Sequence, residues 1–190
     1  TVNGDGVTVD GTLATITQQG TFNVTGTLND GQIAVTAAGG TVVTMVLNGV
    51  NISNSTSACI NITNAGETDI VLAAGSQNYL YDAADYVYDD PNVDEPTGAL
   101  FSKDRLILSG EGTLTVHGNY NDAIVSKDEL IITSGTFNVF AVDDGIRGKD
   151  YLQIDGGTIN ITSGGDAMKS DEDEDAELGY IEISAGTFDI

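Results

Sequence analysis

Residues 143–171 read DDGIRGKDYLQIDGGTINITSGGDAMKSD, which is nearly the same pattern written twice. Counting from Asp122, three such copies follow one another at a spacing of 22 residues, and a related copy, GALFSKDRLILSGEGTLTVHGNYN, precedes them at residues 98–121. Each copy holds three short segments in which apolar and polar residues alternate, with a glycine just before the third. Alternation of this kind is typical of half-buried strands, and the fixed period indicates a repeat architecture.

Three strands and three corners in about 22 residues predict an all-β fold, a right-handed parallel β-helix in which equivalent residues of successive coils stack about 4.8 Å apart. A β-sandwich would need hairpin turns roughly every 8 to 12 residues and would not repeat its side chains at this period. The columns expected to face the core are Leu100, Ile124, Ile146 and Met168; Leu106, Leu130, Leu152 and Ile181; and Leu114, Phe137, Ile159 and Phe188.

We expect one β-helix domain over residues 1–190, since this length suits a single domain with its own core. Its first part, 1–76, keeps the alternation without strict spacing and is expected to form irregular coils. The segment 77–98 holds both prolines and four tyrosines and is expected to be a loop insertion. Regular coils should then fill 99–190, interrupted by an acidic loop, DEDEDAEL, at 171–178.

The charge of the chain restricts its partners. There are 29 acidic against 6 basic residues, a formal net charge of -23, which argues against binding to nucleic acid or to anionic membranes and makes a cation the natural partner. No apolar run is long enough to cross a membrane. Cys59 has no cysteine partner and is expected to be a buried thiol, and a functional role for His117 is not expected. No signal peptide is visible, and export stays open.

The 22-residue period also puts carboxylates in register. Two stacked carboxylates about 5 Å apart repel by roughly 1 kcal/mol at the screening of water and roughly 3 kcal/mol at an effective dielectric near 20. One expected column has no lysine or arginine beside it in the sequence, whereas in the other Lys103, Lys127 and Lys149 adjoin the aspartates and suggest salt bridges along the stack. The two columns are Asp122, Asp144 and Asp166, and Asp104, Asp128, Asp150 and Asp171.

A hard divalent cation would neutralise such a column, and Ca²⁺ tolerates the irregular oxygen geometry of loop corners. The sequence therefore predicts one or more calcium ions. The expected ligands are Asp122, Asp143, Asp144 and Asp166, with Asp128, Asp150 and Asp171 as further ligands. A solvated acidic face without a specific ion remains the alternative.

Several stretches together carry a family resemblance: GTLNDGQIAV at 26–35, VTMVLNGVNISNSTSACINI at 43–62, ALFSKDRLILSGEGTLTVHGNYNDAIVSKDELIITSGTFNV at 99–139, and 143–171. The chain resembles the bacterial carbohydrate-binding domain family of right-handed parallel β-helices, which is similar to the family 9 polysaccharide (pectate) lyases. The resemblance implies a secreted or cell-surface protein that binds acidic pectic or cellulose-like polysaccharides with calcium held by coil aspartates. Carried onto this sequence, it implicates Asp143, Asp144, Asp166 and Asp171, and then Asp122, Asp128 and Asp150. Ala123 and Ala167 stand where the signature usually has glycine, which bears on corner geometry.

Three functions remain open on these grounds. A calcium-dependent lyase acting by β-elimination on uronates would need a base, and the candidates are Lys127, Arg147, Lys149 and Lys169. Because three of these recur as repeat elements, a structural role is expected for them, and polysaccharide binding without cleavage is the favoured function. A structural or filament-forming surface protein, built by end-to-end stacking or homo-oligomerisation, is the third.

Tyrosines suit sugar recognition because their rings stack on pyranoses and their hydroxyls form hydrogen bonds. The possible sugar contacts are Tyr79, Tyr81, Tyr86, Tyr88, Tyr120 and Tyr151, with ordinary packing as the alternative for each.

Overall fold

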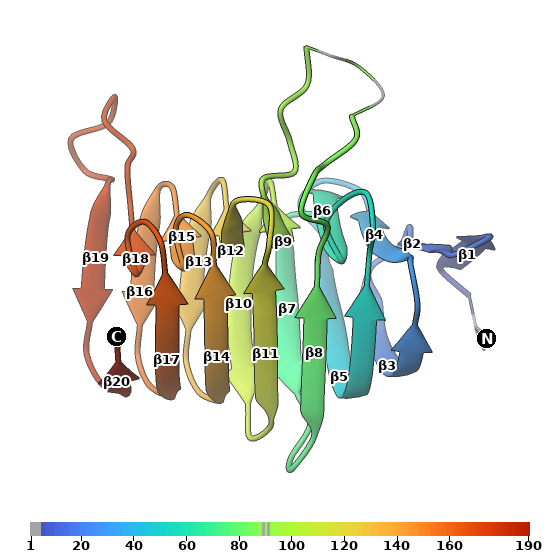
Figure 1. Ribbon diagram of the computed structural model, residues 1–190, viewed down its shortest axis with the longest axis horizontal. Coiled ribbons are helices and arrows are strands. Elements are labelled where there is room, and N and C mark those ends of the chain that lie inside the picture. The colour runs from blue at the N-terminus through green and yellow to red at the C-terminus, as the bar shows by residue number, and fades with distance from the viewer. Residues whose placement is uncertain (1–4, 89, 91) are drawn as a thin grey trace.

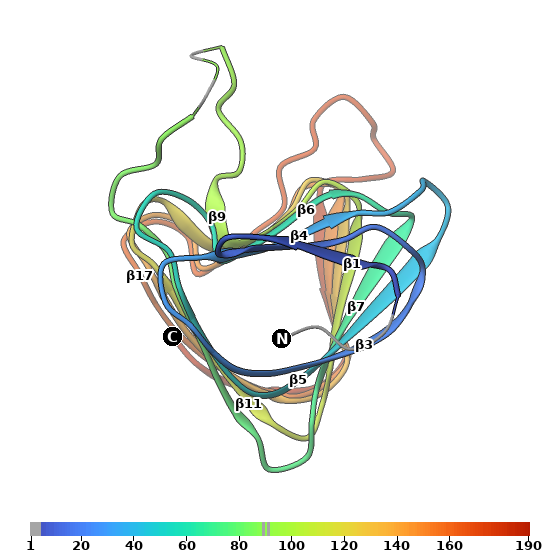
Figure 2. The same cartoon turned by 90° about the vertical axis from the view of Figure 1, so that its right-hand side faces the viewer.

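The structure is a computed structural model that describes residues 5–88, 90 and 92–190. Its regular elements over these residues are all β-strands, and none of them is a helix that could cross a membrane. The strands coil into a parallel β-helix (Figure 1). Seen from the N-terminal end, successive strands run clockwise away from the viewer, which is a right-handed coil as predicted (Figure 2).

The first face of the solenoid is an eight-stranded sheet. Its order is β1 (Val7–Asp10), β2 (Leu13–Ile16), β4 (Gln32–Thr36), β6 (Ile60–Asn64), β9 (Gly98–Ser102), β12 (Asp122–Ser126), β15 (Ile146–Gly148) and β18 (Met168–Lys169). All neighbours are parallel except β1 and β2, which form an antiparallel hairpin at the N-terminal end.

The other two faces belong to one twelve-stranded sheet. One face carries β7 (Glu67–Leu72), β10 (Arg105–Gly110), β13 (Glu129–Ile132), β16 (Tyr151–Ile154) and β19 (Tyr180–Ile183), and the other carries β8 (Gln77–Tyr81), β11 (Thr113–Gly118), β14 (Thr136–Ala141), β17 (Thr158–Ser163) and β20 (Thr187–Asp189). They meet at β5 (Val42–Ser53), which pairs with β7 in its first half and with β8 in its second, and β3 (Gly20–Leu28) pairs with β5.

The register confirms the predicted columns. On the first face Leu100 pairs with Ile124, Ile124 with Ile146, and Ile146 with Met168. The other two faces repeat this pairing from Leu106 to Ile181 and from Leu114 to Phe188. Because the side-chain period of a strand is two, this register sends one alternating set into the core of every coil. Most of that set is fully buried, Phe137 included.

The first coils depart from the regular period. Ala14 pairs with Ile33 across a coil that is shorter than the later ones, and Ile33 pairs with Ile60 across a coil that is longer. In these coils one long strand replaces two, since β5 bends within its length at Gly49, which has a φ of 75°. The Asn78 side-chain oxygen accepts hydrogen bonds from the backbone N–H groups of Gly49 and Val50 and so stabilises the bend.

Two insertions leave the coils, and both stand over the eight-stranded sheet (Figure 2). The first insertion, residues 82–97, begins five residues later than the sequence predicted. The prediction was wrong there because residues 77–81, although tyrosine-rich, form the regular strand β8 with an alternating burial pattern. The second insertion, residues 170–179, contains the predicted acidic loop.

Candidate functional site

The first aspartate column lies where the strands of the eight-stranded sheet begin. The Oδ1 atom of Asp122 accepts a hydrogen bond from the backbone N–H of Asp144 at 3.1 Å, and Oδ1 of Asp144 accepts one from the N–H of Asp166 at 2.8 Å. Each carboxylate therefore satisfies a backbone donor of the next coil. This explains part of the register in structural terms and leaves the second oxygen of each carboxylate for other partners.

Three of the predicted ligands meet in one cluster. Asp122, Asp143 and Asp144 each offer an oxygen, and these oxygens lie within 4.8 Å of one another. Asp122 and Asp144 are 1% and 3% exposed, whereas Asp143 faces solvent. Gly165 permits this approach, because a Cβ atom there would lie 2.3 Å from Oδ1 of Asp143. Two buried carboxylates and one accessible carboxylate are a donor set that suits a hard cation open to a further ligand.

Asp122 carries the clearest sign of an unmet partner. Its Oδ2 atom is buried and accepts no hydrogen bond among the described residues. Burial raises the pKa of this carboxyl to about 6, and the neighbouring Asp144 and Asp143 charges add to the rise. A buried carboxylate oxygen without a donor is costly unless a cation binds it.

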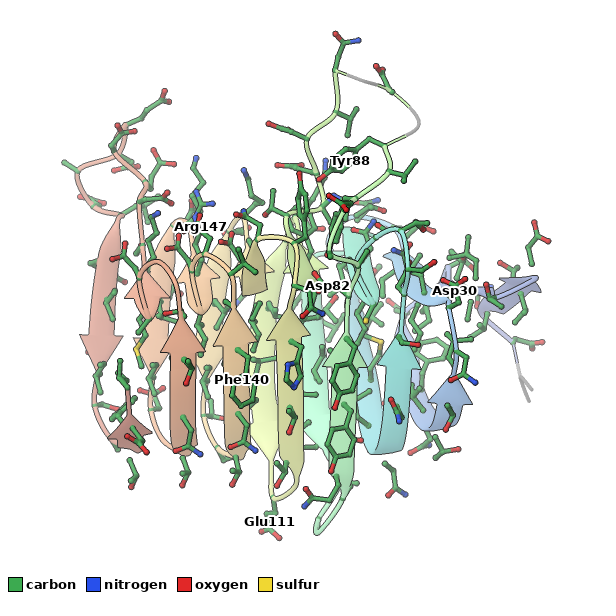
Figure 3. All side chains as sticks on the ribbon, viewed as in Figure 1. Asp30, Asp82, Tyr88, Glu111, Phe140 and Arg147 are labelled. Carbon is green, nitrogen blue, oxygen red and sulfur yellow. The ribbon has the colours of Figure 1, made fainter. Side chains whose placement is uncertain are left out.

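Two basic side chains border the cluster, although none directly flanks the aspartates of this column in the sequence. Lys169 Nζ lies 2.8 Å from Oδ2 of Asp144, and the nearest nitrogen of Arg147 lies 3.9 Å from Oδ2 of Asp122. Arg147, labelled in Figure 3, holds Asp171 more closely through two hydrogen bonds of 2.6 and 3.1 Å. The sequence neighbourhood missed both contacts because each joins two different coils.

The remaining predicted ligands lie apart from the cluster. Asp166 is the next residue of the column and is exposed. Asp128 and Asp150 follow the other ends of β12 and β15 and stack on each other, and burial together with Asp128 raises the pKa of Asp150. Asp171 is held by Arg147.

The sequence also predicted salt bridges from Lys103, Lys127 and Lys149 to the column that contains Asp128 and Asp150, and this prediction was wrong. Lys103 and Lys127 both pair with Glu95 of the first insertion, at 2.8 and 3.0 Å, and Lys149 pairs with Glu172 of the second. The insertions supply these carboxylates because both stand over the eight-stranded sheet, and the three lysines directly follow its strands β9, β12 and β15. Of the four base candidates, only Arg147 and Lys169 thus adjoin the cluster.

The six tyrosines do not form one surface. Tyr86 and Tyr120 stack at 4.2 Å, and the hydroxyl of Tyr88 donates to the carbonyl of Pro96, so these three pack at the base of the first insertion. Tyr79 and Tyr81 lie on the outer side of β8. The remaining one, Tyr151, stacks on Tyr180 on a different face.

Sequence reasoning missed Asp82 at the base of the same insertion. It is 6% exposed, and its carboxylate accepts hydrogen bonds from the Tyr86 hydroxyl and the backbone N–H of Asn119. Burial raises its pKa to about 6. Its position outside the repeat left no signal in the sequence.

The fold and the cluster define a parallel β-helix with a candidate cation site. A family model described as "Carbohydrate-binding domain-containing protein" matches residues 10–190, and the chain belongs to this family. A curated relative from Acetivibrio thermocellus with the same description is 40% identical over 139 residues, which are 73% of this chain and 49% of the relative. The chain therefore spans about half the length of that relative.

A solved structure described as the polysaccharide lyase-like protein from C. thermocellum, in a gadolinium derivative, superposes with a TM-score of 0.96. It is 38% identical, and the match covers 98% of this chain and 75% of that one.

Proposed function

We propose that this chain is an extracellular or cell-surface domain that binds acidic polysaccharides through calcium and does not cleave them. The observation that carries the proposal is the buried Oδ2 atom of Asp122, which lacks a donor among the described residues and lies in a cluster with Asp143 and Asp144. A cation at this point would give that oxygen its missing partner.

The local charges support a divalent ion. Asp122, Asp143 and Asp144 lie beside Arg147 and Lys169, and Arg147 also binds Asp171. These four carboxylates and two basic side chains leave a formal charge of about -2 near the cluster. The similar solved structure is a gadolinium derivative, and a lanthanide seeks the same hard oxygen ligands as calcium. Both points favour Ca²⁺ over a thiolate- or imidazole-seeking metal.

Binding of an acidic glycan follows from the exposure of one ligand. Asp143 faces solvent while its two neighbours are buried. When bound, calcium would supply an electrostatic bridge between these aspartates and a uronate carboxylate. Arg147 and Lys169 would hold the buried carboxylates in place and limit their mutual repulsion.

Cleavage is not part of the proposal, because β-elimination needs an unprotonated base beside the metal. The hydrogen bond to Asp144 raises the pKa of Lys169, which keeps its amine protonated, and Arg147 is engaged by Asp171. A lyase would instead need a basic group with a depressed pKa.

Retention on immobilised polygalacturonate, measured with calcium and with a chelator, tests the proposal. We expect retention with calcium, its loss with the chelator, and its loss in Asp144→Asn, while Asp173→Asn, which removes an exposed carboxylate of the second insertion, retains binding. Retention that ignores the chelator contradicts the metal bridge. A rise in ultraviolet absorbance from unsaturated products in the same mixture contradicts the absence of cleavage.

A further inference from the structure

The outer side of β8, β11, β14 and β17 carries no ionised side chain at neutral pH, and β20 adds Asp189, beside Asn160, at the C-terminal end of the same face. Burial lowers the pKa of His117 below its usual value, which keeps the one titratable imidazole neutral. In a chain of net charge -23 these four strands stand out from the other two faces, which carry most of the acidic strand residues and all the basic residues. Its twelve outward side chains are Gln77, Tyr79, Tyr81, Thr113, Thr115, His117, Thr136, Asn138, Phe140, Thr158, Asn160 and Thr162.

Three of these residues form a row of stacked rings along the solenoid axis. Strand pairing puts Tyr81 beside His117 and His117 beside Phe140. Both ring pairs have centroids 4.6 Å apart and planes within 17° of parallel. Since ring planes in contact lie about 3.5 Å apart, these rings are offset sideways by roughly 3 Å, and part of each ring face stays uncovered. Tyr81 and Phe140 are accordingly 36% and 41% exposed.

A row of polar side chains runs beside the rings. The side-chain N–H of Asn160 donates to Oδ1 of Asn138 at 2.8 Å, and the Asn138 amide donates to the Thr115 hydroxyl at 3.4 Å. These bonds fix the orientation of the amides and leave further donors and acceptors towards solvent. Uncovered ring faces next to ordered amides suit a pyranose, whose C–H face is apolar and whose rim carries hydroxyls.

This face is open and is separate from the aspartate cluster. Both insertions stand over the eight-stranded sheet, and no other described segment covers β11 or β14 (Figure 2). Phe140 lies over the front of β14, whereas Arg147, beside the cluster, lies at the upper edge of the same view (Figure 3). An acidic glycan would find no basic side chain here and would be repelled by Asp189 of β20, so this surface favours an uncharged polymer.

We propose that the row Tyr81, His117 and Phe140, with the amides of Asn138 and Asn160, is a second glycan-binding face that takes a neutral, extended polysaccharide along the solenoid axis without any metal. The two faces would then bind glycans of different charge on one rigid scaffold. This inference does not depend on calcium binding at Asp122, because the two sites lie on different faces.

The test uses the chain in chelator with two neutral probes, insoluble microcrystalline cellulose for retention and cellohexaose for calorimetry. Since an aromatic contact contributes about 0.5 to 1.5 kcal/mol, and 1.4 kcal/mol is tenfold in affinity, we expect about two- to tenfold weaker binding in Tyr81→Ala or Phe140→Ala, and a larger loss in the double variant. The matched control is Tyr180→Ala, which removes an equally exposed ring, 41%, stacked on Tyr151 on another face.

Four results overturn the inference: no retention of the unaltered chain in chelator, unchanged binding in the double variant, an equal loss in Tyr180→Ala, or a dimer in sedimentation that the double variant dissociates, which would make the face a contact between copies. Calcium-dependent retention on polygalacturonate should survive in the double variant. Failure of one site is therefore distinguishable from failure of the other.

Discussion

Replacing Asp122 by asparagine should stabilise the chain without calcium, and this advantage should shrink or vanish with calcium. The side chain is 1% exposed, its Oδ1 accepts the Asp144 N–H, and its Oδ2 has no donor among the described residues. Asparagine keeps the first acceptor and puts an amide N–H where the unpartnered oxygen was, next to the carboxylates of Asp143 and Asp144. Without a cation this removes a buried charge, whereas with calcium it removes a ligand.

The magnitude follows from the raised pKa of Asp122. A folded-state pKa of about 6 against an ordinary 3.8 means that the favourable, protonated form is lost as the pH rises through 6. At pH 8 the ionised, desolvated carboxylate then costs about 3 kcal/mol, which is the most that Asp122→Asn can gain in chelator. Calcium at 100 times its Kd stabilises the unaltered chain by about 2.7 kcal/mol, or about 5 to 11 °C in Tm for a domain of this size.

Thermal unfolding at pH 8, followed by circular dichroism with chelator and with millimolar calcium, checks both halves. In chelator the variant should have a higher Tm than the unaltered chain. Calcium should raise the Tm of the variant much less, so that the difference between the two Tm values shrinks, vanishes or changes sign. Asp173→Asn, an exposed carboxylate in the second insertion, is the control for net charge. The reasoning about the site fails if calcium stabilises Asp122→Asn as much as it stabilises the unaltered chain, and the reasoning about desolvation fails if the variant gains nothing in chelator.

Three further outcomes follow from other parts of the fold. Phe137→Ala, at a fully buried position, should lower the free energy of unfolding in denaturant by about 3 to 5 kcal/mol, and a loss below 1 kcal/mol would contradict the assignment of its column to the core. Glu95→Gln breaks two partly exposed lysine pairs, so unfolding should change by less than about 1 kcal/mol while limited proteolysis of the first insertion accelerates; Asp94→Asn is the control. Asp82 has a pKa raised to about 6, so its stabilising protonated form is lost above that pH, and Asp82→Asn should gain about 1.4 kcal/mol relative to the unaltered chain between pH 5 and pH 8; a difference that does not vary with pH contradicts this.

The repeat made most of the fold predictable. Its fixed period sets the register of β9 to β20, and register decides which side chains face inward, so the core columns followed directly. The period is absent before β6, where one coil is shorter and the next is longer than the later ones. In this part of the chain one bent strand takes the place of two separate strands. A bend at Gly49 supported by Asn78, far along the chain, leaves no periodic signal.

The candidate site was predictable only as far as backbone register reaches. Register puts Asp122 and Asp144 together, but whether a neighbour joins them depends on side-chain direction, which brings Asp143 in and leaves Asp166 exposed. Lys169 and Asp144 are 25 residues apart, slightly more than one 22-residue period. Predicting their contact therefore requires knowing which way the Lys169 side chain points from β18 as well as the period.

The aromatic row was hidden for another reason. Tyr81 and His117 are separated in the sequence by the first insertion, whereas His117 and Phe140 are separated by about one coil. A single period cannot relate all three residues. Their alignment appears only once β8 is recognised as a strand rather than as part of the insertion.

The ion pairs explain why an acidic glycan would depend on a metal here. Each of the six basic side chains already has a carboxylate partner within the chain: Lys103 and Lys127 share Glu95, Arg105 contacts Glu67 and Glu129, Arg147 binds Asp171, Lys149 binds Glu172, and Lys169 binds Asp144. An approaching uronate would have to displace one of these carboxylates, and the displaced group would then face a protein of net charge -23. A divalent cation avoids that exchange, because it adds positive charge without breaking an existing pair. Binding to polygalacturonate should therefore increase with the calcium concentration. Neutralising a single lysine outside the cluster, as in Lys103→Gln, should leave the affinity for polygalacturonate nearly unchanged.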